Sequence, residues 1–194
     1  MEPISLRGVH VTVEPLSHEH CSHLEDAVRD GELHKFWYTS IPEPGSVSTE
    51  IDRRLSLLEQ GSMLPFAVID NKSSRPIGMT TYMNIDHANK RVEIGSTWYR
   101  KSVQRTPLNT ECKLLLLQHA FEALDCIAVE FRTHFVNFQS RKAIERVGAK
   151  LDGILRSHSI SSNGTLRDTA VYSIIAAEWP MVKANLQWQL DKPR

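Results

Sequence analysis

Several short segments of the chain alternate apolar and polar residues with a period of two, which is the pattern of a half-buried β-strand. The first of these segments places Val9, Val11 and Val13 on one face. The expected strands are 9–16, 64–70, 76–85, 91–99, 127–135, 149–160 and 166–175. A Ser-Asn-Gly sequence at 162–164 is a strong hairpin signal, so the last two strands are expected to pair.

Five other segments carry apolar residues at the three- and four-residue spacing of an amphipathic helix. They are 17–29, 49–60, 107–124, 137–148 and 177–190. Pro107 suits the first position of the third helix, and Thr106 before it is expected to cap that helix. Asn137 and Gly148 have the character of residues that begin and end the fourth.

The order of these elements, β-α-α-β-β-β-α-β-α-β-β, predicts an α+β fold. We expect a mixed, mostly antiparallel central sheet with helices on both faces. A single domain is expected over 1–194, with its core at about 9–175 and a C-terminal helix at about 177–190. The chain is long enough for one such core and too short for two large ones.

Composition excludes several classes of protein. The 23 basic and 23 acidic residues cancel, so neither nucleic acid nor an anionic membrane is an expected partner. No apolar run approaches the roughly 20 residues of a membrane span, and the N-terminal segment lacks the apolar centre of a signal peptide. The three cysteines, Cys21, Cys112 and Cys126, show no metal or redox spacing and are expected to be free thiols. A cytoplasmic protein is therefore expected.

A cluster of three histidines invites a metal interpretation. His18, His20 and His23 lie in the second expected element, but spacings of two and three residues do not bring all three to one helical face. We expect a solvated helix surface here and no metal site.

The segment 90–124 passes from a strand through a polar loop into a helix. In the strand, Val92, Ile94, Ser96 and Trp98 alternate with Glu93, Gly95, Thr97 and Tyr99, so that Glu93 and Tyr99 are expected on one face. The N-terminus of a helix after such a loop binds anions through unpaired N–H groups and the helix dipole. Arg100, Lys101 and Arg105 add positive charge.

This arrangement resembles motif A of the GCN5-related N-acetyltransferases (GNAT), Q/R-x-x-G-x-G/A at the start of a helix. Residues 104–109, with the sequence QRTPLN, match its first position and differ at both small-residue positions. The EIG sequence at 93–95 resembles the family's carboxylate-bearing strand. NFQSRKAIERVGA at 137–149 resembles its N-x-x-S/A-x-x-x-[IV]-x-x-x-G[AF] helix. The resemblance covers about 9–175 and fits the branch of the ribosomal-protein alanine N-acetyltransferases.

The resemblance implies the acyl-CoA N-acyltransferase fold, in which two neighbouring strands separate to admit the co-substrate acetyl-CoA. It implies that the backbone amides of Arg105, Thr106, Leu108 and Asn109 hold the diphosphate, at the loop that Gln104 begins. The main chain of Tyr99 would bind pantetheine. Asn137 could bind the co-substrate through its side-chain amide, and Arg141 is a candidate phosphate ligand or a solvated surface charge.

Two residues are implied as catalytic. Glu93 corresponds to a general base, although it could be an ordinary strand carboxylate paired with Arg91 or Arg132. Ser140 corresponds to the group that protonates the departing thiolate, or it merely supports the helix cap. Other possible bases are His134, Glu111 and His158. Cys112 could form a covalent acyl-enzyme, but a small core thiol is the expected role.

We therefore expect an N-acetyltransferase, in which acetyl-CoA is the co-substrate and the acceptor is a primary amine, either a protein N-terminus or a small molecule. No metal is expected, and the protein would be a monomer or a homodimer. The aromatic segment at 36–38 lines the acceptor pocket or ties a long loop to the core. The altered motif A leaves one alternative, a catalytically idle module that senses acyl-CoA.

Overall fold

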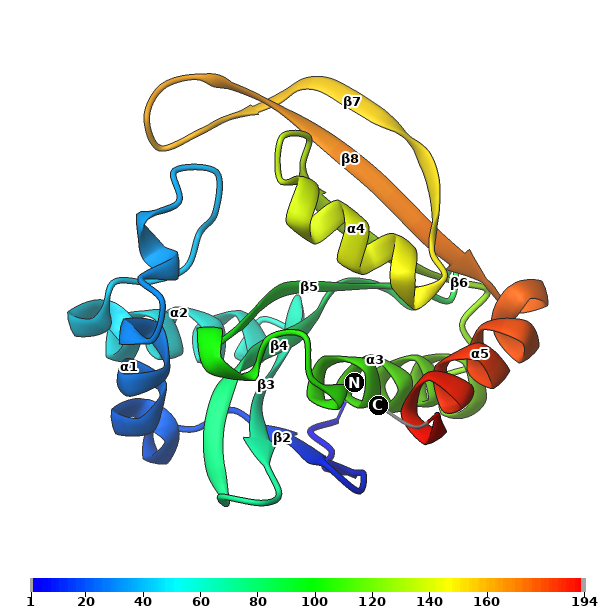
Figure 1. Cartoon of the computed structure of the whole chain (residues 1–194). Helices are drawn as coiled ribbons and strands as arrows, with labels where there is room; N and C mark the ends of the chain where they lie inside the picture. The colour runs from blue at the N-terminus through cyan, green and yellow to red at the C-terminus, as the bar shows by residue number, and fades with distance from the viewer. Residues whose placement is uncertain (1, 193–194) are drawn as a thin grey trace.

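The computed structural model describes residues 2–192, so the ends of the expected domain, at residue 1 and at 193–194, lie outside it. Eight strands form one sheet in the order β1-β2-β3-β4-β5-β6-β8-β7 (Figure 1). They are β1 (Leu6–Arg7), β2 (Val11–Pro15), β3 (Met63–Asp70), β4 (Arg75–Asp86), β5 (Arg91–Tyr99), β6 (Ala128–His134), β7 (Lys150–Ile160) and β8 (Leu166–Ile175). In the described part of the chain only β5 and β6 pair in parallel. The predicted mixed, mostly antiparallel sheet is confirmed.

Helices cover both faces of this sheet, as expected. They are α1 (Cys21–Arg29), α2 (Val47–Glu59), α3 (Pro107–Gln118), α4 (Phe138–Val147) and α5 (Trp179–Asp191). Figure 1 shows α1 and α2 on one side of the strands and α3 and α5 on the other, with the β7–β8 hairpin arching beyond α4. The helix expected to reach residue 124 changes to a π-helical turn at His119–Ala123, and the short β1 was not predicted.

Each face of the sheet has its own hydrophobic core. The first contains Val92 and Ile94 of β5 together with Leu116 of α3 and Leu186 of α5. The second contains Trp98 of β5 together with residues of α1 and α2 such as Leu24 and Ile51. The strand β5 therefore supplies side chains to both cores, first to one face and then to the other.

The change of face occurs at a β-bulge around Ser96. Met79 of β4 pairs with Trp98, whereas Thr81, two residues later, pairs with Gly95, so β5 contains one extra residue there. Ser96 adopts a left-handed backbone conformation with φ of 47°. Because the extra residue reverses the alternation of side chains, the expectation that Val92 to Trp98 share one face is wrong. Glu93 and Tyr99, expected on the same face, lie on opposite faces.

The parallel pairing between β5 and β6 is short. It joins Arg91 to Ala128, Val92 to Val129 and Glu93 to Glu130, and it stops there. Both strands continue beyond it, β5 to Tyr99 and β6 to His134, without pairing to each other. The sheet is thus split at its centre.

Among residues 2–192 no helix combines the length and the apolar character needed to cross a membrane.

Candidate active site

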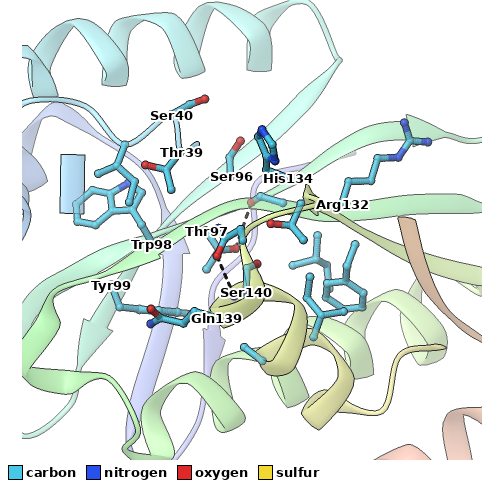
Figure 2. Close-up of a pocket in the computed structure, with 18 of the residues that line it drawn as sticks. Thr39, Ser40, Ser96, Thr97, Trp98, Tyr99, Arg132, His134, Gln139 and Ser140 are labelled. Atoms are coloured by element: carbon cyan, nitrogen blue, oxygen red, sulfur yellow. Dashed lines mark hydrogen bonds between the residues drawn. The ribbon is translucent and has the colours of Figure 1, made fainter. Parts of the chain in front are cut away.

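A cavity of about 600 Å³ lies at the split between β5 and β6. Its walls are the unpaired parts of the two strands, the beginnings of α3 and α4, and the loop that precedes α2. Figure 2 shows Thr97 of β5, Ser140 of α4 and His134 of β6 around this space. Eight of the ten predicted site residues line it: Glu93, Tyr99, Gln104, Arg105, Leu108, Asn109, Asn137 and Ser140. Thr106 and Arg141 do not.

One end of the cavity is the N-terminus of α3. Pro107 occupies the first helical position, as predicted, and Arg105 has φ of 63°. Thr106 is the cap residue by position, but its hydroxyl donates to the carbonyl of Val103 at 2.6 Å and not to the helix. Thr106 therefore fails to cap the helix through its side chain, and the first amides of α3 remain free for an anionic ligand.

Gln104 links this loop to its surroundings. Its Nε2 donates to the carbonyl of Tyr99 at 3.2 Å, and its Oε1 accepts from Nε2 of Gln139 at 3.1 Å. The bond occupies the Tyr99 carbonyl, so a ligand that used this group would share it with Gln104 or displace it. The Tyr99 side chain points away into the core beside Cys112, where burial raises the pKa of its hydroxyl well above the ordinary value.

The second helix N-terminus at the cavity belongs to α4. Asn137 caps it by accepting from the backbone N–H of Ser140 at 3.0 Å. Ser140 lies in the first turn, and Figure 2 labels it and Thr97 of β5 among the residues that line the cavity. The helix ends at Gly148, whose φ of 109° fits the expected glycine stop.

Arg141, on the same helix, points away from the cavity. Its Nε donates to the Tyr172 hydroxyl at 2.9 Å, and its guanidinium lies 4.9 Å from the centre of the Phe135 ring. These contacts anchor α4 to β8 and to the end of β6. In this conformation Arg141 supplies no charge to the cavity.

The other end of the cavity holds Glu93, which is 5% exposed. Its carboxylate accepts from Nδ2 of Asn84 at 2.7 Å and lies 3.6 Å from Nε of Arg132. Burial raises the pKa of Glu93 above its ordinary value; Asn84 and Arg132 oppose this shift, and the neighbouring Glu130 adds to it. Gly95 keeps the space beside it open, because a Cβ there would lie 2.8 Å from Oε1 of Glu93.

The three alternative bases have different surroundings. Glu111 is tied to the N-terminal segment, because it accepts from the backbone amides of Val9, His10 and Val11 at 2.6–2.8 Å. It is a structural carboxylate outside the cavity. His158 lines the cavity and has its Nδ1 3.1 Å from the Thr169 hydroxyl.

His134 also lines the cavity and is 4% exposed. Its Nδ1 accepts from the backbone N–H of Val136 at 3.3 Å, so the neutral ring carries its proton on Nε2, which has no partner. Burial, and then Arg167, lower the pKa of His134. Trp37 packs edge-on against its ring at 5.2 Å.

Phe36 and Tyr38, beside Trp37, line the cavity. Of the two roles considered for this aromatic segment, the structure shows the contribution to a pocket wall.

Cys112 lies in the core, where burial raises the pKa of its thiol. A thiol that resists ionisation is a poor nucleophile, so its surroundings favour the structural role. Among the described residues no three His, Cys, Asp or Glu side chains come together as a metal-binding group. His18 instead lies 3.2 Å from Asp52, and His20 lies 2.9 Å from Glu14.

Among the cavity residues that the sequence analysis did not single out are two cations, Lys113 and Arg167. Lys113 enters the cavity from the middle of α3, and Arg167 enters it from β8, beyond the gap between β5 and β6. The sequence does contain a signal that Lys113 is buried, because this lysine directly precedes the apolar run Leu114 to Leu117 in the expected helix. Arg167 had none, because its place depends on how the β7–β8 hairpin pairs with β6.

Comparison with known proteins agrees with this geometry. Residues 10–150 match the family model described as an acetyltransferase (GNAT) domain. A GCN5-related N-acetyltransferase from Brucella melitensis is 31% identical, with 98% of this chain and 86% of that chain covered and a TM-score of 0.87. No curated protein matches.

Two more distant solved structures share the fold. Mycobacterium smegmatis RimJ, in complex with CoA-disulfide, is 22% identical over 97% of both chains, with a TM-score of 0.79. The ribosomal-protein-S5-alanine acetyltransferase of Vibrio fischeri is 16% identical over 91% of this chain and 98% of that chain, with a TM-score of 0.71. The family model covers most of the chain and the sheet splits where the cavity lies. The chain belongs to the GNAT family, whose members transfer acyl groups from acetyl-CoA.

Proposed function

We propose that this protein transfers the acetyl group of acetyl-CoA directly to a primary amine. The observation that carries the proposal is the split between β5 and β6, because it opens a passage with different chemistry at its two ends. Free helix amides lie at one end, in the first turn of α3, and the buried carboxylate of Glu93 lies at the other. Direct transfer needs both substrates in one passage, and residues from both of these ends line the same cavity.

The co-substrate would be held at the α3 end. The amides of Thr106, Leu108 and Asn109 are suited to a diphosphate because they begin a helix, and Arg105 adds positive charge. Gln104 would order the loop through its bonds to Tyr99 and α4. Asn137 would add a side-chain contact from the beginning of α4. Bound at this end, the co-substrate supplies the activated acetyl thioester.

Glu93 would act as the general base. An amine acceptor is protonated at neutral pH and must lose a proton before its nitrogen can attack. A carboxylate whose pKa is raised by burial is a stronger base than an exposed one, and Glu93 has this property. Arg132, at 3.6 Å, opposes the effect of burial and favours the ionised carboxylate.

Ser140 would serve the departing sulfur. It lies in the first turn of α4, where its side chain and the end of the helix dipole face the cavity. A hydroxyl there can donate a hydrogen bond to a developing thiolate. No covalent acyl-enzyme is part of this proposal, because the pKa of the buried Cys112 thiol is raised.

The proposal is tested by release of free thiol from acetyl-CoA in the presence of amines. One set contains short peptides with free N-terminal amines, and the other contains small amines and amino acids. We expect acceptor-dependent thiol release and an acetylated product by mass spectrometry with one of the two sets. Binding of acetyl-CoA without thiol release for any acceptor would instead support the idle sensor.

A further inference from the structure

Lys113 is a buried amine inside the passage between the two strands. It is 7% exposed and projects from α3, about 9 Å along the helix from Pro107 at a rise of 1.5 Å per residue. Its Nζ lies 3.0 Å from the Thr97 hydroxyl of β5 and 5.9 Å from the centre of the Phe131 ring of β6. It therefore reaches both strands that border the gap.

The surroundings of Lys113 lack an anion. Its ammonium has three donors and meets two hydroxyl groups, Thr97 at 3.0 Å and Thr80 of β4 at 3.5 Å. Among the described residues no carboxylate lies within 4 Å of Nζ. Burying an ammonium without a counter-ion costs free energy, and a protein retains such a group where a ligand offsets that cost.

The titratable groups around Lys113 do not supply the missing charge. On α3 its neighbour is Cys112, whose pKa is raised, and beyond it Glu111 is already bound by three backbone amides. On β5 the Tyr99 hydroxyl is buried and neutral, and Glu93 lies on the opposite face of the sheet because of the bulge at Ser96. The contacts from β4 and β6 are Thr80 and Phe131, which carry no charge. Burial lowers the pKa of Lys113 to about 8.

We propose that the ammonium of Lys113 is the cation that stabilises the sulfur of CoA as a thiolate when that sulfur leaves the acetyl group. The geometry points to this role because Lys113 lies along α3 between the diphosphate end of the cavity and the strand gap. The proposal rests on the proposed function, since it assigns a further residue to the same reaction.

The chemical step balances without another reactant. Glu93 takes one proton from the ammonium group of the acceptor, and the neutral amine nitrogen then forms a bond to the carbonyl carbon. The carbon–sulfur bond breaks with its electron pair kept by sulfur, and the nitrogen loses its second proton to water as the amide forms. The resulting thiolate is paired with the Lys113 ammonium and receives a proton from water on release. The free energy cost of the unpaired ammonium is removed only when negative charge develops, so the interaction favours the transition state over the ground state.

The test uses CoA and desulfo-CoA, which lacks the thiol, and requires no acceptor. A cation beside a thiol lowers the thiol pKa by about one unit or more. We expect the ultraviolet absorbance of the thiolate to give a lower thiol pKa for CoA bound to the wild-type protein than for CoA bound to Lys113→Met. At pH 8.5 the wild type should bind CoA more tightly than desulfo-CoA, by less than the tenfold that a full pKa unit would give, because the thiol of free CoA is only partly ionised at this pH. The variant should bind both alike.

Two further variants separate charge from structure. Lys113→Gln retains hydrogen bonds to the threonines without a charge and should lose the thiol effect as Lys113→Met does. Lys72→Met, at an exposed turn between β3 and β4, removes a lysine far from the cavity and should retain it.

Three results would overturn the proposal. The first is an equal thiol pKa in wild type and Lys113→Met. The second is an acetylated Lys113 in intact-mass analysis after incubation with acetyl-CoA, which would make it a nucleophile. The third is a failure to bind either CoA or desulfo-CoA. This last result would overturn the proposed function as well, whereas equal binding of both ligands would overturn only the role of Lys113.

Discussion

Four buried charged side chains fall into two groups, one whose hydrogen-bonding capacity is filled by the protein and one whose capacity is not; Arg54 lines the cavity but belongs to the first group. Arg54 uses all three guanidinium nitrogens, with Glu50 at 2.7 Å, Thr81 at 2.8 Å and the Ser96 carbonyl at 3.2 Å. Glu111 accepts from three backbone amides. Lys113 and Glu93, which line the cavity, have fewer partners than they could satisfy, and burial shifts the pKa of each toward its neutral form.

The comparison is sharpest between the two cations, because both reach the bulge in β5. Arg54 arrives from α2 on one face and donates to the Ser96 carbonyl, while Lys113 arrives from α3 on the other and meets Thr97. A fully paired buried charge fixes the position of its helix. A buried charge with too few partners needs a ligand to complete its interactions. We use this difference to separate a structural charge, Arg54, from a proposed functional charge, Lys113.

The largest effect is expected for Arg54→Met. Removing one member of a buried charged network leaves its partners unpaired and should destabilise the protein by about 3 kcal/mol, measured by denaturant unfolding. The matched control is Arg53→Met, because Arg53 binds the same Glu50 from an exposed position and should cost less than about 1 kcal/mol. Equal losses for the two variants would contradict the assignment of Arg54 as the structural cation.

Glu93→Gln tests the role of the underpaired carboxylate in the cavity. We expect turnover to fall by about 100-fold or more, within the range for loss of a general base. The pKa of Glu93 is raised, so wild-type turnover should increase with pH through a limb above the ordinary glutamate range, and the variant should lack this limb. Glu130→Gln, at the paired position on β6, should keep the limb. If Glu93→Gln keeps the wild-type limb and rate, the base lies elsewhere and His134 is the next residue to replace.

Lys113→Met should increase stability where Arg54→Met decreases it. An apolar chain of similar length removes a buried charge without a counter-ion, for an expected gain of about 1–2 kcal/mol at pH 7. The pKa of Lys113 is lower in the folded protein than in the unfolded chain, so the unfolded chain binds more protons between pH 8 and about 10.5. Wild-type stability therefore rises relative to the variant over this range. A loss of stability in the variant at pH 7 would make Lys113 a structural residue.

Ser140→Ala removes a neutral donor from the same cavity, so a smaller change is expected. Turnover should fall by about tenfold, with CoA affinity nearly unchanged, because the hydroxyl acts on the departing sulfur and not on the phosphates. The exposed Ser48→Ala on α2 should change neither quantity. Unchanged turnover, with chemistry shown to be rate-limiting, would remove Ser140 from the mechanism.

The smallest effect is expected for Pro107→Gly. Glycine adds one N–H donor at the start of α3 but loses the fixed φ of proline, which costs roughly 0.4–1 kcal/mol through a more flexible unfolded chain. These effects nearly offset in binding, so calorimetric titration with CoA should show a change of only a few-fold. A hundredfold gain in affinity would indicate that the natural loop is a damaged phosphate site and would favour the idle sensor.

Most of the architecture could be predicted because it depends on local patterns. The bounds of β5 and β8 agree with the prediction, and the other predicted elements differ mainly at their ends. The bulge at Ser96 could not be found this way. It depends on the pairing of β5 with β4, and serine carries no signal for a left-handed conformation.

The eight proposed site residues that line the cavity lie on recognisable motifs. Residues brought in by tertiary packing were missed, as Lys113 and Arg167 illustrate. Arg141 was a candidate phosphate ligand because a guanidinium suits phosphate oxygens, with a solvated surface charge as the alternative, but it follows Ser140 by one residue and one step along a helix turns a side chain by about 100°. That step is enough to direct Arg141 toward Tyr172 and away from the ligand.

The three-residue seam between β5 and β6 has a mechanical consequence. Among residues 2–192 it is the only pairing within the sheet that joins strands β1 to β5 to the β6-β8-β7 group. Local opening should therefore begin there, where few backbone hydrogen bonds must break. A ligand that spans the gap and contacts both borders closes this seam and is bound only by the folded state. A co-substrate bound in this way would therefore also hold the two halves of the sheet together.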